Sequence, residues 1–192
     1  MSLITKVKFG KENKIHIEYK VERQVNGKTD YDEFTLNCVD KPRPEFEVVF
    51  INLRKHVLEI CELPADVSDV EKVIVKGVSF SYSESESGES VMGATITASR
   101  SLSKSNAPLI INTPHKFDVA HNDKQPITLL LTPECADLLY ELIEEAEKYI
   151  DGERSQLNMF DVTVKAEDTE EMNLNLVIPE AAKSKSKILS KV

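Results

Sequence analysis

Two stretches near the N-terminus alternate between apolar and polar residues, which is typical of strands that bury one face. They cover 15–25 and 34–38, and the pair Asn26-Gly27 lies between them. Both turn residues tolerate a positive φ angle, so the sequence predicts a type I′ hairpin. An earlier strand over 4–9 is expected to join it. Counting outward from a two-residue turn pairs apolar residues with each other: Tyr19 with Phe34, Ile17 with Leu36, and Ile15 with Cys38.

Apolar residues at three- and four-residue spacing predict two helices. The first is expected over 44–62, because the periodic pattern ends before Pro64. The second is expected over 133–151, because Thr132 can cap its start and Gly152 is placed to stop it. The two apolar stripes consist of Phe46, Val49, Phe50, Leu53, Val57 and Ile60, and of Cys135, Leu138, Leu139, Leu142, Ile143, Ala146 and Ile150.

The middle of the chain predicts a second hairpin. Its strands are expected over 70–82 and 91–99, where apolar residues again alternate with polar ones. Gly77 is expected to mark a bulge in the first of these strands. The acidic, serine-rich segment 83–90 is expected to form the exposed tip of the hairpin.

Further strands are expected later in the chain. The apolar residues at 109–111 predict one strand, and the continuous apolar run 127–131 predicts a buried one. Beyond the second helix, alternation at 162–164 and 172–176 predicts a terminal hairpin. The whole pattern favours an α+β fold, in which antiparallel hairpins form one or two sheets and two helices pack on them.

Three segments make up the expected domain organisation. Residues 1–152 form the α+β domain, residues 153–180 hold a short motif and the terminal hairpin, and residues 181–192 form a frayed tail. Lysine alternates with serine in that tail, which gives it a basic character.

Composition places the chain among ordinary globular proteins, with 41% apolar and 30% charged residues over 192 positions. No apolar run approaches the length that spans a bilayer, and the N-terminus lacks an apolar core of signal-peptide length. We therefore expect a cytoplasmic protein with no membrane partner. Cys38, Cys61 and Cys135 are odd in number and widely spaced, which favours reduced, buried thiols. The net charge of −9 argues against bulk affinity for nucleic acid.

A candidate docking motif follows the second helix. Gln156, Leu157, Met159 and Phe160 stand in the order Gln-Leu-x-(Leu/Met)-Phe. This order resembles the pentapeptide by which bacterial replication and repair proteins dock on the DNA sliding clamp. The resemblance implies that the three apolar residues fill a pocket while Gln156 supplies directional hydrogen bonds at its edge. Met159 stands where leucine is commoner, and Asn158 occupies a permissive position.

A structural interpretation competes with this one. Leu157 and Met159 share strand parity, and Phe160 would point to the other face, so the segment can instead begin the terminal hairpin. Docking would then require that hairpin to open. The resemblance covers five residues and implies no fold for the remainder of the chain.

The loop 113–123 holds two histidines and two aspartates, which are side chains that can bind zinc or a harder metal. Its candidate ligands are His115, Asp118 and His121, although their spacing matches no metal motif. A polar surface loop is the alternative interpretation. Because no nucleophile elbow or phosphate-binding glycine loop occurs, we expect no catalytic residue, no cofactor and no enzymatic activity.

Lysines near the first hairpin suggest a second kind of partner. Lys6, Lys8, Lys20 and Lys28 lie close to aromatic residues in the predicted sheet, and such a face can bind single-stranded nucleic acid by charge and stacking. The alternative is that the lysines protect an edge strand from aggregation and that the aromatic residues belong to the core.

These patterns favour a non-enzymatic accessory protein of DNA replication or recombination that docks on a sliding clamp. By analogy with small accessory proteins of similar layout, a phage or mobile element is the expected source. The alternative, from a different class, is an acidic interaction or inhibitor module that binds a basic partner. It would present the helix face 141–151 and the tip 83–90 to that partner.

Overall fold

The protein has an α+β fold, described by a computed structural model for residues 2–10 and 14–155. Its strands are β1 (Ser2–Phe9), β2 (Ile15–Val25), β3 (Lys28–Cys38), β4 (Val73–Glu84), β5 (Ser90–Leu102), β6 (Ser105–Asn112) and β7 (Lys116–Phe117). Its helices are α1 (Pro44–Ile60), the short α2 (Val67–Val70) and α3 (Pro133–Ile150). The strands form one antiparallel sheet in the order β3-β2-β1-β4-β5-β6, with β7 paired to β5.

The first hairpin forms as its sequence predicts. Asn26 and Gly27 both have positive φ angles, of 53° and 74°. Strands β2 and β3 pair in the predicted register, which sets Tyr19 opposite Phe34, Ile17 opposite Leu36 and Ile15 opposite Cys38. The turn chemistry and the apolar pattern therefore specify the same alignment, because a shift by one residue would turn every buried side chain outward.

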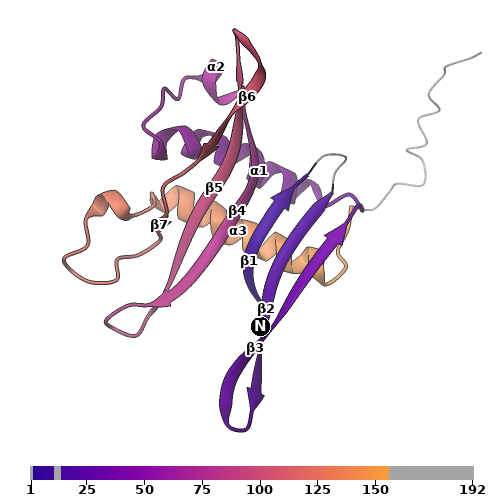
Figure 1. The fold of residues 1–192 in the computed structure, drawn as a ribbon, viewed down its shortest axis with the longest axis vertical. Coiled ribbons are helices and arrows are strands. Elements are labelled where there is room, and N and C mark those ends of the chain that lie inside the picture. The colour runs from indigo at the N-terminus through magenta and orange to yellow at the C-terminus, as the bar shows by residue number, and fades with distance from the viewer. Residues whose placement is uncertain (1, 11–13, 156–192) are drawn as a thin grey trace, which may run out of the picture. The chain divides into compact units, whose positions relative to one another are not determined.

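The sheet consists of two halves with the same order of elements. Each half has three consecutive strands and then a long helix, β1-β2-β3-α1 and β4-β5-β6-α3, and in the second half β7 and a short 3₁₀ turn at 127–129 lie between β6 and α3. The halves join where residues 6–8 of β1 pair with residues 77–79 of β4. Both long helices lie on one face of the sheet (Figure 1). Among the strands, helix α1 packs mainly on β4 and helix α3 on β1, so the helix of each half covers the first strand of the other half, next to the junction.

Aromatic side chains connect the two helices with the sheet. Phe9 of β1 lies 5.6 Å from Phe50 of α1, measured between ring centroids, and Phe46 lies 6.0 Å from Tyr149 of α3. The rings of Phe46 and Phe50 stack at 5.6 Å. These rings join the apolar faces of both halves into a single hydrophobic core, which neither half could complete alone.

The predicted starts of the two long helices, at residues 44 and 133, are confirmed, and the helices end at Ile60 and Ile150, close to the predicted 62 and 151. Helix α1 begins at Pro44, and α3 begins at Pro133 after Thr132, whose Oγ1 accepts a hydrogen bond from the Cys135 N–H at 3.3 Å. The bulge expected at Gly77 is also present, as a register shift between Val75 and Gly77.

One strand prediction is wrong. Residues 127–131 form the 3₁₀ turn η2 (Ile127–Leu129), in which Ile127 is 84% exposed, and only Leu131 is buried. Beyond η2, Leu130 makes a single bridge to Phe117. The run folds back on itself, because the N–H groups of Leu129 and Leu130 donate to the carbonyls of Pro126 and Ile127 at 3.0 and 2.9 Å, and these groups are then not available for strand pairing.

Candidate docking site at the end of helix α3

Helix α3 ends in a hydrogen-bonded C-cap that directs the chain away from the helix. Gly152 has a φ angle of 96°, and its N–H donates to the carbonyl of Tyr149 at 3.3 Å. The Glu153 N–H donates to the carbonyl of Lys148 at 2.9 Å. These two bonds make a Schellman motif, in which glycine adopts the left-handed conformation without a steric penalty.

The segment after this cap is held against the connection between β3 and α1. The buried hydroxyl of Tyr149 donates to the carbonyl of Asp40 at 2.7 Å, and burial raises the pKa of Tyr149, so the donor stays protonated. The guanidinium of Arg154 lies 3.5 Å above the centroid of the Tyr149 ring. The Ser155 N–H donates to the carbonyl of Lys41 at 3.0 Å, which fixes the backbone at that residue.

Ion pairs add a second attachment at the same place. Arg43, just before α1, pairs with Glu153 at 2.7 Å and approaches the buried carboxylate of Glu145 at 3.8 Å. Lys148 donates to Glu145 at 2.7 Å, and this hydrogen bond raises the pKa of Lys148. Part of the acidic helix face 141–151 is therefore neutralised within the protein and is not available to a basic partner.

The predicted clamp-binding residues begin directly after this anchored segment. Ser155 is the last described residue, and Gln156, Leu157, Met159 and Phe160 lie outside the residues that the structure describes. The structure therefore places the residue that precedes the motif, Ser155, next to the connection 39–43.

The two histidines of the loop 113–123 lie on the face of the sheet that the helices leave open. His115 shares hydrogen bonds with the hydroxyls of Ser81 at 3.0 Å and Thr95 at 3.2 Å. The ring of His121 is hydrogen-bonded through Nε2 to Ser83 Oγ at 2.7 Å and through Nδ1 to Gln125 Oε1 at 3.1 Å. Both rings pack edge-on against Phe117, with centroids 4.9 and 4.5 Å away. All four ring nitrogens are thus engaged by neighbouring side chains.

Asp118, the third candidate ligand, bonds in a different direction. Its Oδ1 accepts from the Met92 N–H at 3.0 Å, and its Oδ2 accepts from the hydroxyl of Tyr140 on α3. Burial, together with this hydrogen bond, raises the pKa of Tyr140 to about 12. The structure therefore separates Asp118 from His115 and His121. Within the described ranges, no three histidine, cysteine, aspartate or glutamate side chains converge as metal ligands.

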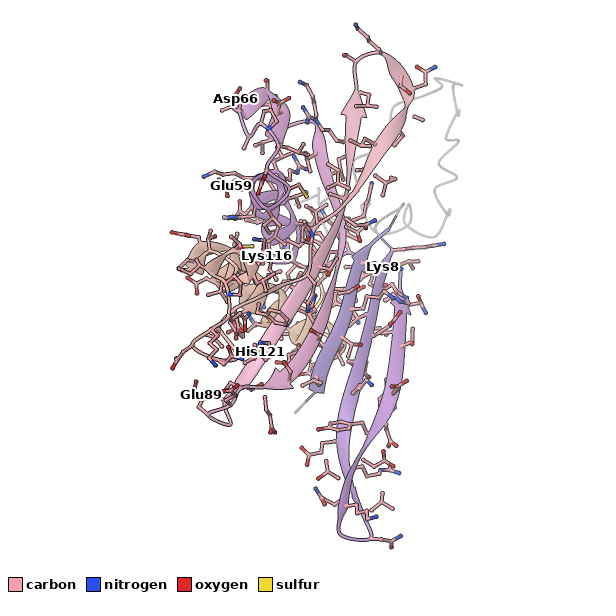
Figure 2. The ribbon with its side chains drawn as sticks, turned by 60° about the vertical axis from the view of Figure 1, so that its left-hand side comes forward. Lys8, Glu59, Asp66, Glu89, Lys116 and His121 are labelled. Atoms are coloured by element: carbon pink, nitrogen blue, oxygen red, sulfur yellow. The ribbon has the colours of Figure 1, made fainter. Side chains whose placement is uncertain are left out.

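The lysines of the first hairpin do not form one uncompensated patch. Lys6, Lys8 and Lys20 lie on the open face of the sheet, and Figure 2 shows Lys8 on the side away from the helices. Lys6 pairs with Glu18 at 3.1 Å, and Lys20 pairs with Glu33 at 2.7 Å. Lys28 pairs with Val25 beside the hairpin turn, so its strand parity directs it to the opposite face.

The cysteines are three free thiols in different environments. Cys135 is buried in α3, and burial raises its pKa to about 12, so the thiolate is scarce at neutral pH. Cys38 and Cys61 are half-buried, which is less burial than their apolar positions predict.

A groove between α1 and α3 is a feature that the sequence analysis missed. It has a volume of about 670 Å³, and exposed Ile51 of α1 contributes to its lining. Ile51 falls outside the buried stripe of its helix, as does the exposed Val48. Apolar residues off the main stripe were the signal that could have identified this surface.

Comparison with known proteins gives no relative for this fold. No family model, no curated protein and no solved structure matches the chain. Within the described residues, no helix has both the length and the apolar character needed to cross a membrane.

Proposed function

We propose that this protein is a non-enzymatic accessory factor of DNA replication or recombination that binds a bacterial-type sliding clamp. The observation that carries the proposal is the order Gln156-Leu157-x-Met159-Phe160, which follows the anchored residue Ser155 without a spacer. In this interpretation the three apolar side chains enter a pocket on the clamp, and Gln156 bonds to the rim of the pocket.

The folded part supports the proposal in two ways. Among the described residues, the hydrophobic core is assembled from buried positions between 4 and 149, all of which precede the pentapeptide in the sequence. The contacts of Tyr149, Arg154 and Ser155 hold the residues that immediately precede the motif in the sequence. A fixed origin limits the volume that a tethered motif explores, which lowers the entropy lost on binding.

Surface plasmon resonance against a purified bacterial sliding clamp tests the proposal. The full-length protein should bind, and Leu157→Ala/Phe160→Ala should weaken binding at least about tenfold, because truncated anchor residues typically cost more than 1 kcal/mol each. The matched control is Leu174→Ala/Leu176→Ala, which removes two apolar side chains from the same C-terminal region and should leave the affinity unchanged.

The motif alone provides an independent measurement. A synthetic peptide of residues 153–161 should compete with the full-length protein for the clamp. Absence of binding by the full-length protein, or equal binding by the wild type and the Leu157/Phe160 variant, would overturn the proposal.

A further inference from the structure

The groove between α1 and α3 has an apolar floor that lies open to solvent. Ile51 is 49% exposed, and Leu138 and Val70 are half-buried at the same surface. An exposed apolar surface flanked by charged residues is typical of a protein interaction site. The groove lining consists of Ile51, Asn52, Lys55, His56, Val70, Glu134, Asp137, Leu138 and Glu141.

The two walls of the groove differ in charge. Glu134, Asp137 and Glu141 line the α3 wall, and among the described residues none of them has a hydrogen-bond or ion-pair partner on its side chain. On the α1 wall, Lys55 and His56 both pair with Glu59 at 3.2 Å. Figure 2 shows Glu59 on the helical side of the molecule. The groove therefore carries a surplus of negative charge on one wall.

The geometry favours a helical ligand over an extended one. Both walls are helices whose backbone groups are bonded internally, so they offer no free edge to an incoming strand. A helical ligand satisfies its own backbone and contacts the groove through side chains alone. The acidic wall extends from Glu134 to Glu141, which is about 10 Å or two helical turns.

We propose that this groove binds a basic amphipathic helix of a partner protein. Apolar residues of the ligand, spaced three and four apart, pack on Ile51 and Leu138. Lysine or arginine residues along its flank pair with the free carboxylates of α3. This interaction does not depend on the sliding-clamp proposal, because it uses the first half of α3 and none of residues 156–160.

Fluorescence anisotropy with a model ligand tests the inference on the full-length protein. The probe is a fluorescein-labelled helix of about 15 residues, with leucine at three- and four-residue spacing and lysine elsewhere. Asp137→Asn/Glu141→Gln should weaken its binding roughly tenfold, since each exposed ion pair contributes a few-fold to affinity. Ile51→Ser should weaken binding by a similar factor. A probe with glutamate in place of lysine should not bind.

A charge-matched variant separates groove binding from general attraction. Glu86→Gln/Glu89→Gln removes two negative charges from the exposed tip between β4 and β5, and it should bind the probe as the wild type does. An equal loss in both acidic variants, or no probe binding by the wild type, overturns the inference. Self-association that Ile51→Ser abolishes, in place of probe binding, would assign the groove to a second copy of the chain.

Discussion

The missing side chain of Gly93 allows the loop 113–123 to lie directly on the sheet. A Cβ atom at this position would collide with Nε2 of His115 and would lie 2.6 Å from Oγ of Ser81. Glycine therefore makes room for the ring of His115, whose hydrogen bonds to Ser81 and Thr95 hold the loop in place. The neighbouring Asp118 turns toward α3. Gly93 and Asp118 thus determine that the ring of His115 lies on the sheet while the carboxylate of Asp118 bonds to α3.

We expect a double-mutant cycle to detect this close contact. Gly93→Ala should lower the free energy of unfolding by about 1–2 kcal/mol through overpacking. His115→Ala should cost about 1 kcal/mol through lost hydrogen bonds. Because the second change removes the ring that the new methyl group meets, the double variant should cost about 1 kcal/mol less than the sum.

Urea denaturation followed by circular dichroism measures these differences. The control pairs Gly93→Ala with His16→Ala, a histidine on β2 that bonds to Asn37 at 2.7 Å and does not touch Gly93. That pair should be additive. Additivity in the Gly93/His115 pair would show that the contact is not a source of strain.

At the scale of elements, the short helix α2 is tied to the sheet by one carboxylate. Asp69 accepts from Lys72 at 3.1 Å and from Arg100 of β5 at 2.6 Å. The hydrogen bond from Lys72 and the charge of Arg100 hold the pKa of Asp69 below its usual value. None of the residues of α2 is fully buried, so this ionic contact is important for its position.

Stability should therefore depend on pH through Asp69. A carboxylate with a lowered pKa in the folded state contributes stability above the ordinary aspartate value of about 4, and the contribution is lost as the pH falls through the lowered pKa. Asp69→Asn should therefore lower the urea midpoint at pH 7 and have little effect at strongly acidic pH. The exposed Asp123→Asn is the control and should change the midpoint little at either pH. A constant difference between wild type and Asp69→Asn at all pH values would contradict this assignment.

For the whole molecule, two features make the halves interdependent. Strands β1 and β4 pair at the junction, and the helix of each half packs on a strand of the other half. The junction pairs only residues 6–8 with 77–79, and beyond it the Tyr82 hydroxyl donates to the carbonyl of Ile4 at 2.8 Å. Helices α1 and α3 each cover the first strand of the other half, β4 and β1 respectively. Separating the halves would expose both apolar faces, so we expect them to unfold together.

Gly77→Ala tests this interdependence. An added Cβ would lie 2.7 Å from the backbone oxygen of Val7 and 2.8 Å from Cγ of Lys8, so β1 and β4 would have to move apart. We expect a loss of about 1–3 kcal/mol in the free energy of unfolding. Circular dichroism and tyrosine fluorescence should still report a single coincident transition. The control is Ser79→Ala, an exposed change on the same strand. Two separate transitions would show that the halves fold independently.

Local features could be predicted from the sequence because a few neighbouring residues encode them. The Asn26-Gly27 turn and the alternation on either side determine the register of β2 and β3. Thr132 and Gly152 determine where α3 begins and ends. The clamp-like order at 156–160 is likewise a local pattern, and it stays a prediction.

Only the tertiary structure decided how these elements meet. Every strand has two edges, and apolar alternation does not say which edge pairs with which neighbour. Tertiary packing therefore decided that β1 pairs with β4 and that the helix of each half packs on a strand of the other half. The apolar run at 127–131 likewise forms a 3₁₀ turn closed by its own backbone hydrogen bonds, although its apolar character is equally compatible with a buried strand. The groove beside Ile51 also depends on the meeting of α1 and α3, which are far apart in the sequence. No local pattern encodes such a contact.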